Sequence, residues 1–296
     1  MDDAVREKLR YAGRVSREAK ELGVSLVREG ASLLDIAERI EDHMRKRGAP
    51  PAFPTCVSVD DIAAHYSPVH DDRLTLRRGN VVKLDLGAQV DGYIADTAVT
   101  VEVGTRNWTD LIKASEVALD TAIEVCRPKT PTRLIGAAVE RAIESYGFKP
   151  ISNLTGHTIE RYSLHAGKSV PNVGGMGDDV IEAGDILAIE PFSTNGAGKV
   201  EGRKTGNIYR LLSARDITPA STNEFLKKLQ ESFKTLPFAE RWGYALDRKA
   251  PGHLGRLLRA GRIMTYEFLS DAGRGIVAQA EHTMIIDDGG TEVTTR

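Results

Sequence analysis

The spacing of hydrophobic residues along the chain predicts four helices before residue 150. In each of them apolar residues recur every three or four positions, which places these residues on one helix face. Ser32 is a suitable N-cap for the second helix, and the Gly-Ala-Pro-Pro run that starts at Gly48 would end it. The predicted helices span residues 3–29, 32–47, 107–125 and 130–145.

Apolar runs with a different spacing predict strands. Short strands are expected around Val57 and from Val81 to Val103. The runs VIEAGDILAIEPF (180–192) and RGIVAQAEHTMII (274–286) also have strand character. The pattern contains no internal repeat and no low-complexity segment.

The overall composition is that of a globular protein. Of the 296 residues, 41% are hydrophobic and 28% are charged, which suits one large domain or one domain with an insertion. The formal net charge of −2 argues against a molecule that binds nucleic acid or an anionic membrane over its whole surface. The two cysteines, Cys56 and Cys126, argue against a disulfide framework and fit a reducing cytosol.

The N-terminal segment is charged throughout and has no apolar signal core. No run approaches the roughly 20 apolar residues that a membrane span requires. We therefore expect a cytoplasmic protein without a membrane segment.

One segment has a charge of its own. Residues 198–262 contain 14 Lys and Arg against 6 Asp and Glu, whereas the rest of the chain contains 26 against 36. This segment is interpreted as a mostly helical insertion between two core strands. Its positive charge could serve to dock on ribosomal RNA, or it could simply be a solvated surface around a helical core.

Two aspartates interrupt the apolar segment KLDLGAQVDGYIADTAV, residues 83–99. The Asp-Gly pair at 91–92 is typical of a two-residue hairpin turn. Pairing across that turn puts Asp85 opposite Ala98, so Asp85 and Asp96 would point to the same face as diagonal neighbours, roughly 7 Å apart at the backbone. A three-residue turn would instead put them on opposite faces.

Two ionised carboxylates this close in an apolar sheet repel each other and have lost solvent. Either one of them is protonated or a cation lies between them. The alternative is that one aspartate caps a backbone group while the other is exposed at a sheet edge.

Four further residues extend the pattern. The segment TGHTIERYSLHAGKSVPN contains His157 and His165, and the two later apolar runs are interrupted by Glu190 and Glu281. Each acid could be explained separately by a salt bridge or a bend to solvent. Together, four carboxylates and one imidazole form a ligand set for two divalent ions that share bridging carboxylates. Because no cysteine belongs to the set, manganese, iron or cobalt suits it at least as well as zinc.

At this point the chain resembles the pita-bread metallopeptidases, and specifically the type 2 methionine aminopeptidases. The motifs AFPTCVSVDDIAAHYSP (52–68), GHTIERYSLHAGKSVP (156–171) and VAQAEHT (277–283) carry the resemblance, which runs from about His65 to the C-terminus. The long segment between Glu190 and Glu281 also matches this branch. The chain has no long polybasic N-terminal extension, so it resembles the short, archaeal-style form. The ligand set that the resemblance implies is Asp85, Asp96, His157, Glu190 and Glu281.

The resemblance implies an α+β, pita-bread fold with a helical, winged-helix-like insertion. The expected division is a catalytic domain formed by residues 1–194 and 267–296, interrupted by a basic, mostly helical insertion at 195–266. A monomer is expected, with two divalent ions per chain, either Co, Mn, Fe or Zn.

The resemblance also implies a role for each site residue. Asp85 would chelate one metal, Asp96 and Glu281 would bridge both, and His157 and Glu190 would complete the other shell. Glu190 would be the general base, and His65 and His165 would contact the substrate amide and stabilise the tetrahedral intermediate. The methionine pocket would be formed by three apolar or aromatic side chains, which ordinary core packing could also explain: Phe53, Leu164 and Tyr266.

The implied activity is removal of the initiator methionine from nascent polypeptides when the second residue is small. A proline-specific aminopeptidase or prolidase of the same fold is an alternative, but in those enzymes an acid typically follows the second histidine, whereas Ala166-Gly-Lys follows His165 here. A second alternative is a non-catalytic relative that binds ribosomes or RNA. Such relatives have lost ligands, and this chain retains all five.

Overall fold

The computed structural model of the chain spans residues 1–296, with side chains described for 1–202 and 206–296. Its helices are α1 (Asp3–Leu26), α2 (Leu33–Lys46), α3 (Thr109–Val125), α4 (Thr132–Ser145), α5 (Ala220–Phe233), α6 (Glu240–Leu246) and α7 (Ala250–Arg259). The main sheet and the short strand β2 include β1 (Cys56–Val59), β2 (Ile62–Ala64), β3 (Val81–Val90), β4 (Tyr93–Glu102), β6 (Thr155–Glu160), β7 (Ser163–Pro171), β8 (Ile186–Ile189) and β14 (Glu281–Asp287). The others are β5 (Lys149–Pro150), β9 (Phe192–Thr194), β10 (Val200–Leu211), β11 (Phe238–Ala239), β12 (Ile263–Asp271), β13 (Val277–Gln279) and β15 (Gly290–Val293).

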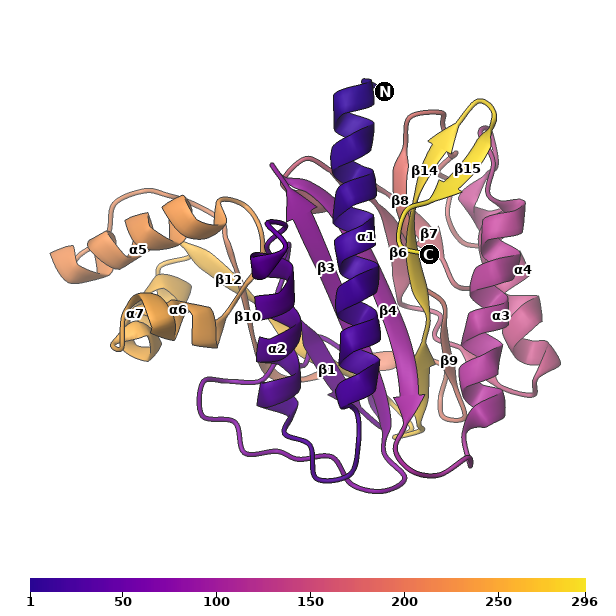
Figure 1. Ribbon diagram of the computed structural model, residues 1–296, viewed down its shortest axis with the longest axis horizontal. Coiled ribbons are helices and arrows are strands. Elements are labelled where there is room, and N and C mark those ends of the chain that lie inside the picture. The colour runs from indigo at the N-terminus through magenta and orange to yellow at the C-terminus, as the bar shows by residue number, and fades with distance from the viewer.

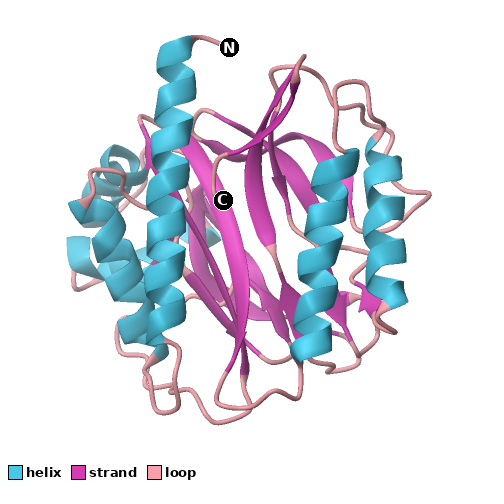
Figure 2. Cartoon of the chain, turned by 45° about the vertical axis from the view of Figure 1, so that its right-hand side comes forward, coloured by secondary structure: helices cyan, strands magenta, loops and turns pink.

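The main sheet follows the order β1-β3-β4-β14-β8-β6-β7, with β15 added to β14. Helices α1 to α4 cover one face of this sheet (Figures 1 and 2). One apolar cluster lies between the sheet and α1 and α2, and a second lies beneath α3 and α4. The opposite face of the sheet is therefore left for the functional site. These curved sheets with helices on one side are the expected α+β, pita-bread fold.

The four helices predicted from apolar spacing are confirmed. In α1 the residues Leu9, Ala12, Val15 and Ala19 are fully buried, as a single apolar face requires. The side chain of Ser32 caps α2 by accepting a hydrogen bond from the backbone N–H of Asp35 at 3.3 Å. These helices cover the sheet because their buried faces match its apolar outer face.

The two later apolar runs do not form one strand each. Within residues 180–192, only β8 belongs to the main sheet. Residues 274–286 form two strands, β13 and β14, which belong to different sheets. The chain bends at Pro191 and Ala280, where the Ala280 N–H donates to the Pro191 carbonyl at 3.3 Å. Hydropathy cannot detect this break because both sides of it are buried.

Helices α5 to α7 form a separate lobe at the side of the main sheet (Figure 1). They surround their own apolar cluster, which includes Phe225, Leu229, Phe238 and Leu257. The lobe is connected through β10 and β12, which pair with each other, and β12 also pairs with β2. The segment predicted as a mostly helical insertion is thus helical only between residues 220 and 259, with a strand at each end.

Candidate metal centre

The β3–β4 hairpin has the predicted two-residue turn. Asp91 and Gly92 both have positive φ, 52° and 85°, as this type of turn requires. Asp85 pairs with Ala98, and Asp96 pairs with Gly87. The two aspartates therefore lie on the same face of the hairpin, which confirms the register predicted from the sequence.

Five neighbouring strands each bring one candidate ligand to that face. Ala98, the partner of Asp85, pairs on its other side with Glu281 of β14. The β14–β8 register places Glu190, directly after β8, opposite Glu281. His157 on β6 pairs with Ala188, which shares a face with Glu190 because the two are separated by two positions.

The carboxylates of this cluster are held in a low-dielectric environment. Asp96 and Glu281 are 4% and 1% exposed. Burial raises the pKa of Asp85 to about 7. For Asp96, Glu190 and Glu281, burial is the larger cause and the negative charges of the neighbouring acids add to it, so the pKa of each lies well above the usual range. Without a cation, the cluster would have to take up protons.

Gln279 is a member of this cluster that the sequence did not reveal. Its side-chain amide donates to Asp85, Glu190 and Glu281 at 3.3–3.4 Å. It lies two positions before Glu281 in the VAQAEHT motif, although a bend at Ala280 separates the two residues. The two-residue spacing from Glu281 is the signal that could have pointed to Gln279, because side chains two positions apart in a strand share a face.

The donor set fits a divalent cation. Asp96, His157 and Glu281 each offer a ligand atom, and these atoms lie within 4.8 Å of one another. Three buried carboxylate oxygens have no hydrogen-bond partner among the described residues: Asp85 Oδ1, Asp96 Oδ1 and Glu281 Oε1. Buried carboxylate oxygens without a partner are costly unless a proton or a metal ion satisfies them.

His157 offers a neutral nitrogen donor to the cavity. Its Nδ1 lies 3.3 Å from the carbonyl oxygen of Thr158, which can only accept, so Nδ1 carries the proton and Nε2 is free. Nε2 lies 3.9 Å from Asp96 Oδ2 and 3.7 Å from Glu190 Oε1. Burial lowers the pKa of His157 to about 4, which keeps the ring neutral at pH 7.

A cavity of about 220 Å³ contains the cluster, and all ten site residues named from the sequence line it. His65 and His165 lie beside Tyr266, with ring centroids 5.3 Å and 6.3 Å from the tyrosine ring. His165 also approaches His157 at 4.4 Å. The structure thus brings together the residues expected to bind metal, those expected to contact the amide, and the apolar residues Phe53, Leu164 and Tyr266.

Cys56, Lys83 and His282 lie close to the site residues in the sequence, but each has a different environment in the structure. Cys56 lines the same cavity, and burial raises the pKa of its thiol well above the usual range. Lys83 is fully buried and donates to the carbonyl of Asp60 at 2.7 Å. His282 hydrogen-bonds through Nδ1 to the hydroxyl of Thr295 at 2.8 Å. Neither Lys83 nor His282 lines the cavity.

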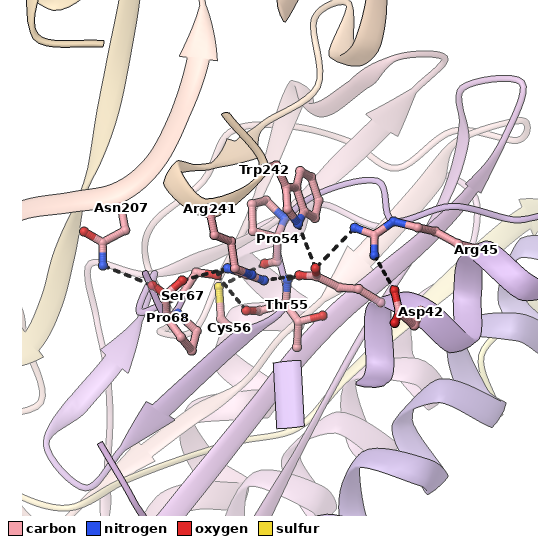
Figure 3. Close-up of polar contacts among 11 residues, drawn as sticks. Asp42, Arg45, Pro54, Thr55, Cys56, Ser67, Pro68, Asn207, Arg241 and Trp242 are labelled. Carbon is pink, nitrogen blue, oxygen red and sulfur yellow. Dashed lines mark hydrogen bonds and ion pairs between the residues drawn. The ribbon is translucent and has the colours of Figure 1, made fainter. Parts of the chain in front are cut away.

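A buried polar network holds the segment that carries Phe53 and His65. Arg241 of α6 forms an ion pair with Glu41 of α2, and its guanidinium also donates a hydrogen bond to the Ser67 hydroxyl at 2.7 Å (Figure 3). Glu41 in turn accepts from the backbone N–H of Thr55 at 3.1 Å. Both ends of the segment are therefore attached to the same ion pair, which also connects the helical lobe to the main domain.

Comparison with known proteins identifies the family. The model of metallopeptidase family M24 matches residues 7–215. The methionine aminopeptidase of Methanocaldococcus jannaschii is 44% identical over 290 residues, 98% of each chain. That of Archaeoglobus fulgidus is also 44% identical, over 297 residues and the whole of both chains.

Solved structures agree on the fold. The structure of a thermophilic Arx1 has a TM-score of 0.87 at 21% identity and covers 99% of this chain and 91% of its own. Methionine aminopeptidase from Thermotoga maritima has a TM-score of 0.73 at 22% identity, with 100% and 98% covered. At such identities these neighbours show the fold alone, whereas the archaeal relatives and the family model also show the activity. The chain therefore belongs to metallopeptidase family M24 and, within it, to the methionine aminopeptidases, which are metal-dependent hydrolases.

Proposed function

We propose that this aminopeptidase works with two divalent ions held by Asp85, Asp96, His157, Glu190 and Glu281. The observation that carries the proposal is the arrangement of one such residue on, or directly after, each of five adjacent strands, all on one face. Carboxylate-rich sets of this kind suit manganese, iron, cobalt or zinc. Bound ions would activate a water molecule and polarise the substrate carbonyl.

The protein side chains would divide the remaining chemistry. Glu190 would accept the proton of the attacking water and pass it to the leaving amine. The Nδ1 of His65 faces the carbonyl of Glu267 at 3.1 Å and must donate to it, which leaves Nε2 to accept from the scissile amide N–H. His165 would stabilise the tetrahedral intermediate.

Substrate choice would follow from the walls of the cavity. Phe53, Leu164 and Tyr266 would hold the unbranched thioether of methionine, whose flexible chain suits an apolar pocket. The second residue must be small because the scissile bond lies against a crowded group of carboxylates. Nascent proteins in the cytoplasm are the substrates that this specificity fits.

The test is release of free methionine from Met-Ala-Ser by metal-stripped protein, with and without added Mn²⁺ or Co²⁺. Release should depend on metal and should be lost in Glu190→Gln. Glu124→Gln is the matched control, because Glu124 is exposed on α3 and away from the cavity. Normal methionine release by Glu190→Gln would remove Glu190 from its proposed role.

The same assay separates the alternatives. Cleavage of Ala-Pro in place of Met-Ala-Ser would indicate proline specificity, as in the prolidase from Pyrococcus furiosus, whose structure resembles this chain with a TM-score of 0.64 at 17% identity. No hydrolysis with any metal would favour a binding protein. The absence of an acid after His165 favours the methionine enzyme.

A further inference from the structure

A second cavity opens beside the proposed active site. This outer cavity has a volume of about 420 Å³ and shares four lining residues with the metal-site cavity. The shared residues are Leu164, His165, Pro237 and Tyr266. The other lining residues are Arg161, Tyr162, Ser163, Arg210, Leu211, Leu212 and Thr235, so the lining includes two arginines and no acid.

Strand pairing explains why Arg210 lies in the outer cavity. Ile208 of β10 pairs with Tyr266 of β12, and both line the metal-site cavity. Arg210 is two positions further along β10 and therefore extends from the same face, toward the outside. Arg210 and His165 line the same outer cavity.

Arg210 has no acidic partner among the residues whose side chains are described. Its Nε is buried and makes no hydrogen bond with those residues, and its one side-chain contact within this set is from a terminal nitrogen to the sulfur of Met264 at 3.6 Å. A guanidinium has five N–H donors and binds carboxylates in a bidentate manner. The terminal nitrogens of Arg210 therefore keep N–H donors that the described side chains do not use, and a ligand in the outer cavity could accept from them.

The rim of the outer cavity is also positive. The Lys234 ammonium donates to the Tyr162 hydroxyl at 2.7 Å, and the Arg161 guanidinium lies 5.5 Å from the centroid of the Tyr162 ring. Asp91 lies nearby, since its carbonyl accepts from Arg161, but its carboxylate is paired with Lys8 at 2.7 Å. An anion entering the outer cavity would meet three cationic side chains.

We propose that the outer cavity is a subsite for the part of the substrate chain that follows the second residue, and that it selects a carboxylate there through Arg210, with Arg161 and Lys234 at the rim. This inference rests on the proposed function. With the methionine side chain in the inner cavity, the peptide must continue outward, and the outer cavity adjoins that route at His165 and Tyr266. An extended chain advances about 3.3 Å per residue, so the next few residues would pass Arg210.

The carboxylate could come from an acidic side chain or from the C-terminus of a short peptide. The first arm of the test uses C-terminally amidated Met-Ala-Ser-Glu-Glu-Ser, with Gln-Gln and Lys-Lys versions for comparison. The second arm compares Met-Ala-Ser as free acid and as amide. In both arms kcat/KM for methionine release is measured in 20 mM and in 1 M NaCl.

We expect the wild type to prefer the Glu-Glu peptide over the Lys-Lys peptide, or the free acid over the amide, by about fivefold or more at low salt. High salt should reduce the preference because it screens charges. Arg210→Met should bring the ratio of kcat/KM between the charged versions to near one. Arg256→Met, which removes an exposed arginine of α7, should keep the full preference.

Two results would overturn the inference. One is equal kcat/KM for all charged versions in the wild type at low salt, a result that does not depend on any variant folding. The other is an unchanged preference in a folded Arg210→Met protein. Absence of methionine release from every peptide would instead contradict the proposed function, so the two failures are distinguishable.

Discussion

Asp85 occupies a position in a central strand where an apolar side chain would ordinarily lie. Its Oδ1 is buried and has no hydrogen-bond partner among the described residues, and its other oxygen receives only the Gln279 amide at 3.4 Å. In the metal-free protein such a carboxyl opposes folding at neutral pH. At the scale of the residue, the site is therefore a source of instability that a bound cation would relieve.

This leads to a prediction about pH. Burial raises the pKa of Asp85 to about 7, above the roughly 3.9 of an unfolded chain. The folded protein binds this proton more tightly, so the stabilising contribution of the neutral carboxyl is present below pH 4 and is lost as pH rises through about 7. Metal-free Asp85→Asn should thus exceed the wild type in stability at pH 7.5, by roughly 1.4 kcal/mol for each pKa unit of the shift.

Urea unfolding of both chelator-treated proteins at pH 4, 5.5 and 7.5 measures this difference. Asp85→Asn also removes the charge that helps to raise the pKa of Asp96, Glu190 and Glu281. The change in the difference with pH therefore reports Asp85 together with these neighbouring acids. Adding Mn²⁺ should reverse the order at pH 7.5 because only the wild type retains the full ligand set. A difference that stays constant from pH 4 to 7.5 would contradict the raised pKa.

At the scale of the element, the β3–β4 hairpin sets the register of the site and its turn touches another hairpin. The N–H of Tyr162, in the β6–β7 turn, donates to the carbonyl of Gly92 at 2.8 Å. A Cβ on Gly92 would lie 2.4 Å from the Tyr162 ring. Gly92 is therefore required both for its positive φ and for this close approach.

We expect Gly92→Ala to lower the free energy of unfolding by about 2–4 kcal/mol, through left-handed strain and collision with the ring. Gly48→Ala is the matched control, since Gly48 also has a positive φ, 73°, but nothing lies within 4 Å of an added Cβ. That control should cost only about 1 kcal/mol. Equal costs in urea titrations would mean that the contact with Tyr162 is unimportant.

The Glu41–Arg241 ion pair joins α2 to α6, and we expect the loss of one partner to lower the stability of the fold strongly. Both side chains are almost fully buried, 1% and 3% exposed. Arg241→Met would leave the Glu41 carboxylate with only the 42% exposed Arg45 as ionic partner in the described network, at a cost of about 3–5 kcal/mol. It should also raise KM, since Phe53 and His65 lie on the segment that the pair holds.

Arg45→Met is the control for that variant. Arg45 contacts the same carboxylate at 3.3 Å but is 42% exposed, so its loss should cost less than about 1 kcal/mol. Unfolding by urea and Michaelis–Menten kinetics on Met-Ala-Ser report the two effects. If Arg241→Met were no more damaging than Arg45→Met, the buried pair would not be what positions the segment.

At the scale of the whole molecule, the charge is divided between two parts. Exposed basic side chains gather on or beside the helices of the lobe: Lys227, Lys228, Arg248, Lys249, Arg256 and Arg259. None of the helices in the described part of the chain has the length and apolar character that crossing a bilayer requires. The division of charge is compatible with ribosome docking and with a merely solvated surface.

Docking predicts co-sedimentation with ribosomes at low salt that weakens steeply as salt rises. Replacing four of these residues by glutamate, Lys227, Lys228, Arg256 and Arg259, should abolish co-sedimentation without changing the rate on Met-Ala-Ser. The same change at four exposed basic residues of the main domain should have little effect: Arg77, Lys113, Arg133 and Arg141. Salt-insensitive binding, or no binding at low salt, would leave the solvated surface as the explanation.

The amino-acid sequence by itself determined the local features of this protein. The first four helices, the hairpin register and the identity of the acids in the strands follow from periodicity and turn chemistry, which depend on residues a few positions apart. The interruptions of the later apolar runs also grouped Glu190 and Glu281 with these aspartates, and the family resemblance singled out His157 as the imidazole ligand and gave each residue a role.

Only the tertiary structure decided the contacts between distant segments. The bends at Pro191 and Ala280, the place of Gln279 among the acids, the Glu41–Arg241 pair and the exposure of Arg210 to an outer cavity all depend on which strands become neighbours. Such neighbours are set by packing across the whole fold, and hydropathy is equally satisfied by any arrangement that buries the same apolar surface.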